Sequence, residues 1–288
     1  MDFLVIGAQK CATSWLFYCL REHPQLCLPE KKREPDYIGG ATFRARGADW
    51  YFNLVGNREP GQLAGAVSVE YLFDANAAPE VARLLPNAKL LAVLREPLDR
   101  AISAYYWLIR KRLIEKAGLV PALEMGLRDV ERGTQSPFAE LLQRGLYGEQ
   151  LNRYLQHFPA EALLIAAYED IANDPARSLS SVYAYLGVDS AFIPPSFRRR
   201  PKANTYLSPL VALERLVPKS RMIAHASDFL NNAARRLGLG DVRPAIPATL
   251  HARLSDFFAE DLKSLHAIVT RAHAVSANTS NAIRTWTA

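Results

Sequence analysis

The chain has 288 residues, of which 49% are hydrophobic, and its formal net charge is +6. Without a Ser/Gly-rich linker, a repeat or a low-complexity tract, this composition predicts one folded domain over residues 1–288. The positive balance suits an anionic ligand. No basic tail with interleaved aromatics indicates nucleic acid, and no run of about 18 apolar residues could span a membrane.

The three cysteines exclude two common frameworks. Cys11, Cys19 and Cys27 are an odd set spaced by eight residues, which is neither a disulfide framework nor a zinc-binding pattern. Only Met1 and Asp2 precede the first apolar run, so we expect no signal peptide. Reduced thiols and the absence of a leader favour a cytoplasmic location.

Short apolar runs alternate with helical patterns along the chain. We expect strands over residues 3–6, 65–69, 89–94 and 162–167, and helices over 14–23, 79–85, 97–112, 138–158, 175–186, 207–237 and 250–274. Continuous apolar strands separated by helices predict an α/β fold, in which helices cover both faces of a parallel sheet. Ligands bind beyond the carboxyl ends of such strands. Residues 275–288 are polar, and we expect a poorly ordered tail there.

The first strand leads into a polar turn that suits an oxyanion. The stretch FLVIGAQKCATS breaks at Gly7 and carries Lys10, Thr13 and Ser14 before the helix. A strand, a short turn and a helix aim backbone N–H groups and a helix N-terminus at an anion. The lysine adds a mobile charge, and the hydroxyls add hydrogen bonds. We therefore predict an oxyanion site, in particular one for a nucleotide phosphate.

A purely structural interpretation of this turn is the alternative. Strand, glycine and helix in this order are common in α/β proteins, where the glycine marks only a tight turn. The segment also departs from the P-loop pattern GxxxxGK[ST], because its lysine follows Gly7 by three residues and no Gly-Lys pair is present.

A second basic site follows the third predicted strand. In the stretch LREPLDRAISAYYW, Arg95 directly follows the strand, and Ser103 lies about two turns into the next helix. Arg95 can bind a phosphate bidentately. In a structural interpretation, Arg95 and Arg100 would instead pair with Glu96 and Asp99. Two phosphate sites at adjacent strand ends predict a ligand with two separated phosphates.

With both motifs in this order, the sequence resembles the sulfotransferases. FLVIGAQKCATSWL is similar to the family's 5′-phosphosulfate loop, and LREPLDRAISAYY to its 3′-phosphate motif. Weaker similarity, nearest to the carbohydrate (heparan-type) and bacterial branch, continues through HPQLCLPEKKREPDYI, LYGEQLNRYLQHFP, YEDIANDP and AYLGV. The resemblance implies a sulfotransferase-type, P-loop-like fold. It also implies the cofactor 3′-phosphoadenosine 5′-phosphosulfate (PAPS), whose product is 3′-phosphoadenosine 5′-phosphate (PAP).

Positions within the motifs carry implied roles. Lys10 would contact the 5′-phosphate and the bridging oxygen, while Arg95 and Ser103 would hold the 3′-phosphate. Other 5′-phosphate contacts would come from Cys11, Ala12, Thr13, Ser14 and Trp15. Tyr147 would line the adenine side or be a core tyrosine. A late basic loop would cover the cofactor or be merely solvated, and its candidates are Arg198, Arg199, Arg200, Lys202 and Asn204.

The resemblance also implies a carboxylate as general base. The family's P-x-x-K-E-x-x-F-F-like segment corresponds to PEKKREPDYI, which departs from the pattern but keeps Glu34 at the position of the glutamate. We predict Glu34 as the base, and a loop carboxylate paired with neighbouring cations is its alternative. His23 is the rival base, although its place at a helix end before a proline also suits a cap.

One departure concerns a lysine. The K-S-x-x-Y-like segment of the heparan-type enzymes corresponds here to VSVEYL, in which Val67 stands at the lysine position. Stabilisation of the leaving group would then depend more on Lys10, or on Lys31 or Lys32. The same departure argues against a heparan-like glycan as the acceptor.

The predicted reaction is in-line transfer of a sulfuryl group, without a metal, to a hydroxyl or amine of a small-molecule, glycan or lipid acceptor. One alternative is a P-loop kinase or NTPase, which needs Mg²⁺ ligands; the third strand ends in Arg95, but Glu169 and Asp170 follow the fourth. Another is a catalytically silent nucleotide-binding scaffold. Nucleic acid is not an expected partner, and the oligomeric state cannot be predicted from these residues.

Overall fold

One parallel sheet forms the centre of the protein in the computed structural model, which describes residues 1–32, 36–56, 58–111, 113–114, 118–198, 244–274 and 277–286. Its strands within these residues are β1 (Phe3–Gly7), β2 (Leu26–Cys27), β3 (Leu63–Val67), β4 (Lys89–Leu94), β5 (Leu163–Ala167) and β6 (His273–Ala274). They lie in the order β2-β3-β1-β4-β5-β6, and every neighbouring pair is parallel. The predicted parallel α/β fold is confirmed.

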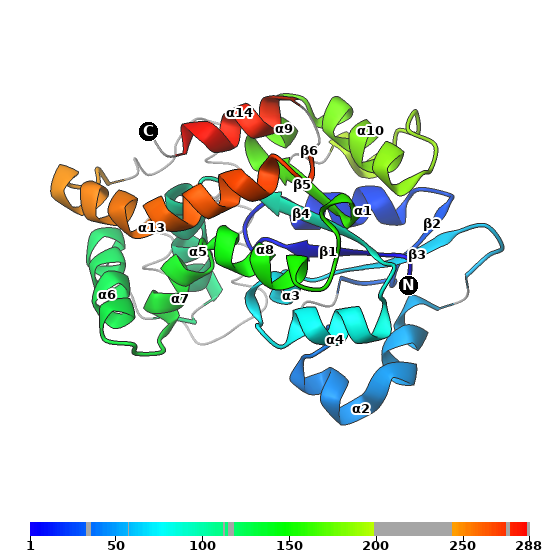
Figure 1. Cartoon of the computed structure of the whole chain (residues 1–288), viewed down its shortest axis with the longest axis horizontal. Helices are drawn as coiled ribbons and strands as arrows, with labels where there is room; N and C mark the ends of the chain where they lie inside the picture. The colour runs from blue at the N-terminus through cyan, green and yellow to red at the C-terminus, as the bar shows by residue number, and fades with distance from the viewer. Residues whose placement is uncertain are drawn as a thin grey trace, which may run out of the picture.

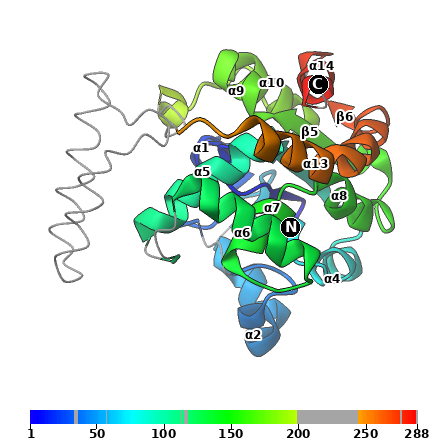
Figure 2. The same cartoon turned by 90° about the vertical axis from the view of Figure 1, so that its left-hand side faces the viewer.

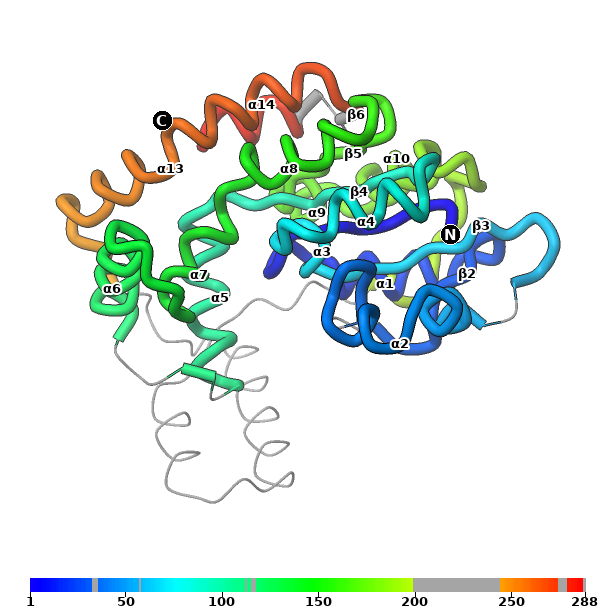
Figure 3. The backbone as a smooth tube through the Cα atoms, turned by 60° about the horizontal axis from the view of Figure 1, so that its bottom comes forward, coloured from blue at the N-terminus to red at the C-terminus, as the bar shows by residue number. Residues whose placement is uncertain are grey.

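Helices cover both faces of the sheet. The helices and short 3₁₀ turns (η) are α1 (Thr13–Arg21), α2 (Ala41–Phe52), η1 (Asn53–Val55), α3 (Glu70–Phe73), α4 (Ala77–Leu84), α5 (Pro97–Lys111), α6 (Leu119–Glu131), α7 (Pro137–Gln143), α8 (Tyr147–Leu155), η2 (Ala160–Ala162), α9 (Tyr168–Asn173), α10 (Pro175–Leu186), η3 (Pro195–Arg198), α13 (Ala248–Val269) and α14 (Ala277–Thr285). In Figure 3, α8 and α13 lie above the strands and α1 lies below them. Helix α10 packs on α1, since the Tyr183 hydroxyl donates to the Cys19 carbonyl at 2.9 Å.

The order of the strands reverses its direction at β1. From β1 the chain builds β2 and β3 on one side of the sheet, and it then crosses to β4 on the other side. A reversal of this kind opens a ligand-binding crevice beyond the carboxyl ends of the strands. Helices α5, α6 and α7 lie beyond these ends in Figure 1 and are nearest the viewer in Figure 2.

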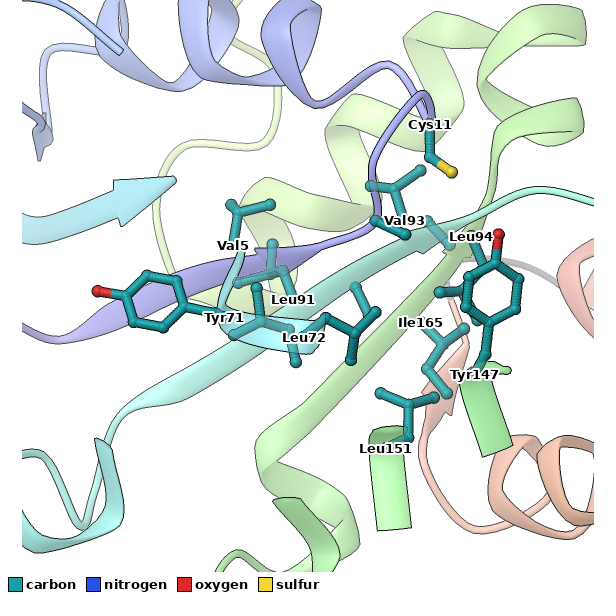
Figure 4. Packing of buried hydrophobic residues seen from close by; sticks show 14 of the residues in the cluster. Val5, Cys11, Tyr71, Leu72, Leu91, Val93, Leu94, Tyr147, Leu151 and Ile165 are labelled. Carbon is teal, nitrogen blue, oxygen red and sulfur yellow. The ribbon is translucent and has the colours of Figure 1, made fainter. Parts of the chain in front are cut away.

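Close packing around β1 fixes the position of its carboxyl end. Every residue of β1 and β5 is buried, as expected for strands covered on both faces. Figure 4 shows Val5 and Leu91 in this packing together with Leu72 of α3. A Cβ on Gly7 would lie 2.8 Å from Leu72 Cβ. Gly7 is therefore required by the close approach of α3 and not by a left-handed turn.

Two expectations about helices differ from the structure, and a third lies outside the described residues. The helix expected over 138–158 is two helices, α7 and α8, because the chain turns at Arg144–Leu146 and Asp261 of α13 caps the second one: its carboxylate accepts from the amides of Gly148 and Glu149 at 2.8 and 2.7 Å. Most of the segment expected as a tail forms α14, which is anchored by the fully buried Ile283. The helix expected over 207–237 lies outside the described residues.

Candidate functional site

The turn after β1 presents open backbone donors. Lys10 and Ala12 have φ of 71° and 61°, so two residues with side chains occupy the left-handed region. Helix α1 begins directly after Ala12 and has no side-chain cap. The first N–H groups of a helix have no partner within it. The amides of Thr13, Ser14 and Trp15 therefore converge with the helix dipole on one anion-sized space.

Lys10 lies at this turn in a largely desolvated position. Its ammonium is 5.7 Å from the centre of the Trp107 ring of α5. Burial, together with the charges of Arg110, Arg95 and Lys32, lowers the pKa of Lys10 to about 8. Several cations thus face the same space, and an anion placed there would stabilise all of them.

The side chain of Cys11 packs into the core below the turn. Its side chain is fully buried, and the thiol donates to the Gln9 carbonyl at 3.5 Å. Burial raises the pKa of Cys11 to about 12, so the group is a neutral thiol and no nucleophile at physiological pH. Figure 4 shows its sulfur and the Tyr147 hydroxyl facing one another. Tyr147 is fully buried too, which favours the core-tyrosine interpretation over an adenine-lining role.

Arg95 forms the second basic site, at the end of the adjacent strand β4. Its guanidinium pairs with Asp99 at 3.0 Å and stacks over the Tyr168 ring, 4.6 Å from the ring centre. The buried Nε has no hydrogen-bond partner among the described residues. Ser103 is also buried and lies on α5, the helix that follows Arg95. The ion pair with Asp99 agrees with the alternative in which Arg95 pairs with neighbouring carboxylates. It nevertheless leaves the Nε of Arg95 without a partner among the described residues.

The N-terminus of α5 is capped by the side chain of Glu96, the residue directly before the helix. The Glu96 carboxylate accepts from the amides of Leu98 and Asp99 at 2.9 and 2.5 Å. The start of α5 is therefore already neutralised, so an anion near β4 would depend on side chains. Burial raises the pKa of Glu96 and of Glu169, whose carboxylate accepts from the Glu96 amide at 3.4 Å.

Arg100 is not part of a surface ion pair. It is fully buried and donates to the Leu141 carbonyl, while its Nε and Nη1 have no hydrogen-bond partner among the described residues. The alternative that pairs Arg100 with Glu96 or Asp99 is therefore wrong. Its charge lies close enough to Cys11 to act on the pKa of that thiol.

A further lysine reaches the turn from the segment after β2. Lys32 Nζ donates to Thr13 Oγ1 at 3.0 Å and is 3.5 Å from Ser14 Oγ. Lys31, by contrast, is exposed. Of the two lysines that the sequence leaves open, the structure brings Lys32 to the site.

Glu34, Arg199, Lys202 and Asn204 lie outside the described residues, as does Arg200. The chain that leads to the basic loop is nevertheless tied to the site. Trp15 Nε1 donates to the Phe197 carbonyl at 3.3 Å, and the Ser196 amide donates to Glu22 at 2.6 Å. Both contacts hold η3 against α1. Arg198, which is exposed, therefore directly follows Phe197, whose carbonyl is bonded to Trp15 in the first turn of α1.

His23 lies away from this site. It follows the C-terminus of α1, whose nine residues span about 13 Å. Its Nδ1 accepts from the Gln25 amide at 3.1 Å, so its Nε2 carries the hydrogen that is donated to the Asp189 carbonyl at 3.0 Å. The ring packs between Tyr183 and Phe192. With both nitrogens used at the amino edge of the sheet, His23 has a structural role.

The sequence patterns gave no role at the cofactor site to three residues that lie there, Trp107, Arg110 and Tyr168. Trp107 and Arg110 follow Ser103 by four and seven residues, so they share its face of α5, and this spacing is the signal that could have found them. Tyr168 follows β5 directly, as Arg95 follows β4.

Other features lie apart from the site. A cavity of about 390 Å³ is lined by Met1, Leu63 and Lys89, among others, at the amino ends of the strands, so it does not belong to the crevice. Within the described ranges, the helices lack the length and apolar character needed to cross a membrane.

Comparisons with known proteins agree on one family. The model of the sulfotransferase domain matches residues 1–200. Heparan sulfate glucosamine 3-O-sulfotransferase 3B1 from Mus musculus is 28% identical over 186 residues, which are 64% of this chain and 45% of that protein. Bifunctional heparan sulfate N-deacetylase/N-sulfotransferase 3 from Homo sapiens is 31% identical over 200 residues, with shares of 65% and 22%. The chain thus spans about half the length or less of these relatives.

Solved structures place the fold in the same group. A sulfotransferase from Alicyclobacillus acidocaldarius has a TM-score of 0.66 and 26% identity, covering 94% of this chain and 96% of that one. A mouse sulfotransferase complexed with PAP has a TM-score of 0.53 and 16% identity, with coverages of 99% and 88%, and shares the fold. Because the family model matches 200 of 288 residues, this chain belongs to the sulfotransferase domain family.

Proposed function

We propose that the protein transfers the sulfuryl group of PAPS to a hydroxyl or amine of an acceptor by in-line displacement. The observation that carries the proposal is the placement of two anion sites at adjacent strand ends. The turn with Lys10 follows β1, and Arg95 follows β4, which pairs directly with β1. Neighbouring strands lie about 4.8 Å apart, so a nucleotide phosphorylated at both ends of its ribose can reach the two sites together.

The residues present suit such a cofactor. The open amides of Thr13 and Ser14 match a 5′-phosphate, and the partnerless Nε of Arg95 matches a 3′-phosphate. Leaving a buried donor unpaired costs about 1–3 kcal/mol, which a bound phosphate oxygen would offset. When bound, PAPS supplies a sulfuryl group that is activated by its phosphate leaving group.

The chain's own residues would stabilise the charge that develops. The Lys10 ammonium and the amides at the start of α1 are already aimed at the position of the departing 5′-phosphate, so they need no rearrangement during the reaction. Arg95 and Ser103 would hold the 3′ end and fix the orientation of the nucleotide. The shielding of Lys10 from water strengthens its interaction with an anion.

We propose Glu34 as the general base that removes the acceptor proton. The position of the segment supports this assignment, because Lys32, two residues before Glu34, contacts the hydroxyl of Thr13 at the turn. The backbone hydrogen bonds of both His23 ring nitrogens also support Glu34 over His23 as the base. The acceptor proton would pass to the Glu34 carboxylate as the new bond to sulfur forms.

The acceptor class is proposed only broadly, as a small molecule or a glycan or lipid hydroxyl or amine. The relatives named for heparan sulfate support a glycan, while Val67 in place of a lysine argues against a heparan-like one. A cytoplasmic location is also a proposal, supported by three cysteines that are all free thiols.

The test is transfer of radiolabelled sulfate from PAPS to a panel of alcohols, phenols, sugars and amines. The wild type is expected to label at least one acceptor class. Glu34→Gln should lower kcat on that acceptor by about 10²–10⁴-fold, whereas Glu30→Gln, an exposed carboxylate of the same segment, should leave it unchanged. Full turnover by Glu34→Gln would rule out the base assignment.

The same assay separates the alternatives. Tight PAP binding without transfer to any acceptor would indicate a nucleotide-binding scaffold. Turnover of ATP that depends on Mg²⁺ would instead indicate a kinase or NTPase.

A further inference from the structure

Lys32 lies against the uncapped N-terminus of α1. Its ammonium donates to Thr13 Oγ1 at 3.0 Å and lies 3.5 Å from Ser14 Oγ, within the first turn of α1. The N-terminus of a helix carries partial positive charge and favours anions. The partial charge of this helix end therefore acts against the charge of Lys32, which two hydroxyls of the same turn help to hold in place.

Lys32 also adds to a group of cations. Its charge lowers the pKa of Lys10, and the charges of Arg110 and Arg95 act on Lys10 in the same direction. Lys32 is half-buried, so solvent screens this repulsion only in part. A ligand that carries negative charge between Lys10 and Lys32 would attract both ammonium groups and offset their mutual repulsion.

We infer that Lys32 is a second catalytic lysine, which binds the 5′-phosphate opposite Lys10 and stabilises it as the leaving group. The inference rests on the proposed function. In the ligand-free protein the hydroxyls of Thr13 and Ser14 accept from Lys32. In the complex the ammonium would contact a phosphate oxygen, and both hydroxyls would be free to donate to the same phosphate.

The hydroxyls explain why a lysine suits this position. A hydroxyl can accept from one partner while it donates to another, so Thr13 can hold the ammonium in place before and after the anion enters. Lys31, next in sequence, is exposed and has no such contact in the described part of the chain. Lys32 contacts the turn and Lys31 is exposed, so substitutions of Lys31 serve as the control for substitutions of Lys32.

The experiment compares two nucleotides and two variants by calorimetry. PAP carries the 5′-phosphate, and adenosine 3′-phosphate lacks it. Lys32→Met should weaken PAP binding at least tenfold and leave the affinity for adenosine 3′-phosphate unchanged. Lys31→Met should alter neither affinity. Lys32→Arg should recover most of the PAP affinity, because it restores the charge.

Turnover provides the second measurement. With PAPS and a labelled acceptor, Lys32→Met should lower kcat at least tenfold. If Lys32 only tethers its segment to α1, Lys32→Met would lower the melting temperature of the free protein and change the affinities for both nucleotides by the same factor, or change neither. Either result overturns the inference.

The outcomes for Lys32 and for the proposed function are distinguishable. Wild-type sulfate transfer with unchanged PAP binding and kcat in Lys32→Met keeps the proposed function and overturns the role of Lys32 in it. Failure of the wild type to transfer sulfate to any acceptor overturns both the proposed function and a catalytic role for Lys32. A selective loss of PAP affinity would then show only that Lys32 contacts phosphate.

Discussion

The ammonium of Lys10 lies over the indole ring of Trp107, 5.7 Å from the ring centre. Lys10 belongs to the turn after β1, and Trp107 lies on α5, which follows β4. This cation–π contact joins the two halves of the proposed nucleotide site, and it holds the lysine where burial keeps its pKa low.

PAP binding should be coupled to the protonation of Lys10. Burial lowers the pKa of the free lysine to about 8, and a bound phosphate favours the charged form and raises that pKa. PAP should therefore bind with uptake of a proton near pH 8–9, and its affinity should fall by up to about tenfold per pH unit above that range. Calorimetry in buffers of different protonation enthalpy measures this uptake.

Lys10→Arg is the matched control for this coupling. The guanidinium stays charged throughout the range, so the alkaline loss of affinity and the proton uptake should both disappear. A wild-type protein whose PAP affinity is constant from about pH 7 to 9.5 would contradict the assignment of Lys10 to the phosphate.

Trp107→Leu should shift the same titration. A cation–π contact is worth about 0.5–2 kcal/mol to the charged lysine, so its loss lowers the pKa of Lys10. The pH at which PAP affinity begins to fall should move down by roughly half a unit to one unit. Trp107→Phe keeps an aromatic face and should shift it less. An unchanged titration in the leucine variant would show that the ring contributes nothing to the charge of Lys10.

Arg95→Met should separate the two ends of the nucleotide. The variant removes the only guanidinium proposed for the 3′-phosphate, so PAP should bind about 10–100-fold more weakly, as expected for the loss of a charge-assisted pair. Adenosine 5′-phosphate has no 3′-phosphate, and its affinity should be unchanged. Equal losses for both nucleotides would place Arg95 outside the 3′ site. The comparison needs only equilibrium binding, because both nucleotides are unreactive.

Ala12→Gly should stabilise the protein. Ala12 has φ of 61°, a left-handed conformation that costs a residue with a Cβ about 1–2 kcal/mol. The larger entropy of glycine in the unfolded chain offsets part of this gain, so we expect about 0.5–1 kcal/mol of added stability and a rise in Tm of a few degrees. Ala82→Gly in the interior of α4 is the control and should lower Tm. A lower Tm for Ala12→Gly would contradict the backbone conformation of the turn.

His23→Gln should affect stability but not catalysis. The substitution removes the imidazole contacts to Tyr183 and Phe192 and disturbs two hydrogen bonds with the backbone. We expect a loss of about 1–3 kcal/mol of unfolding free energy and an unchanged kcat for the folded fraction, measured well below its Tm. A kcat reduced by orders of magnitude at full folding would restore His23 as a candidate base.

Much of the fold follows from local patterns. The four longer strands were predicted within about two residues, because buried parallel strands are continuous apolar runs. The two-residue strands β2 and β6 have no such run, and they exist only because β3 and β5 offer them pairing partners. The break between α7 and α8 depends on Asp261, more than one hundred residues away, and no local pattern could reveal it.

The candidate site was predictable where its chemistry is contiguous in sequence. Lys10, Thr13 and Arg95 lie in short motifs, and the parallel sheet brings these motifs to one edge. The role of Lys32 could not be separated from that of Lys31, since the choice depends on how the segment after β2 returns to α1. The burial of Arg100 was also hidden, because its charged group gives no apolar signal.

Two helices, α1 and α5, begin at the proposed nucleotide site, and only α1 has an N-terminus without a side-chain cap. Glu96 caps the N-terminus of α5 with its carboxylate, whereas α1 starts at Thr13 and Ala12, at its N-cap position, provides no side-chain cap. The 5′ end of a nucleotide would thus be recognised by main-chain amides, which no side-chain substitution deletes, in addition to Lys10 and Lys32. The 3′ end would depend on a few replaceable side chains. Mutational tolerance should therefore be uneven across the site: chain geometry secures part of the affinity for the 5′ end, whereas residue identity alone maintains the 3′ end.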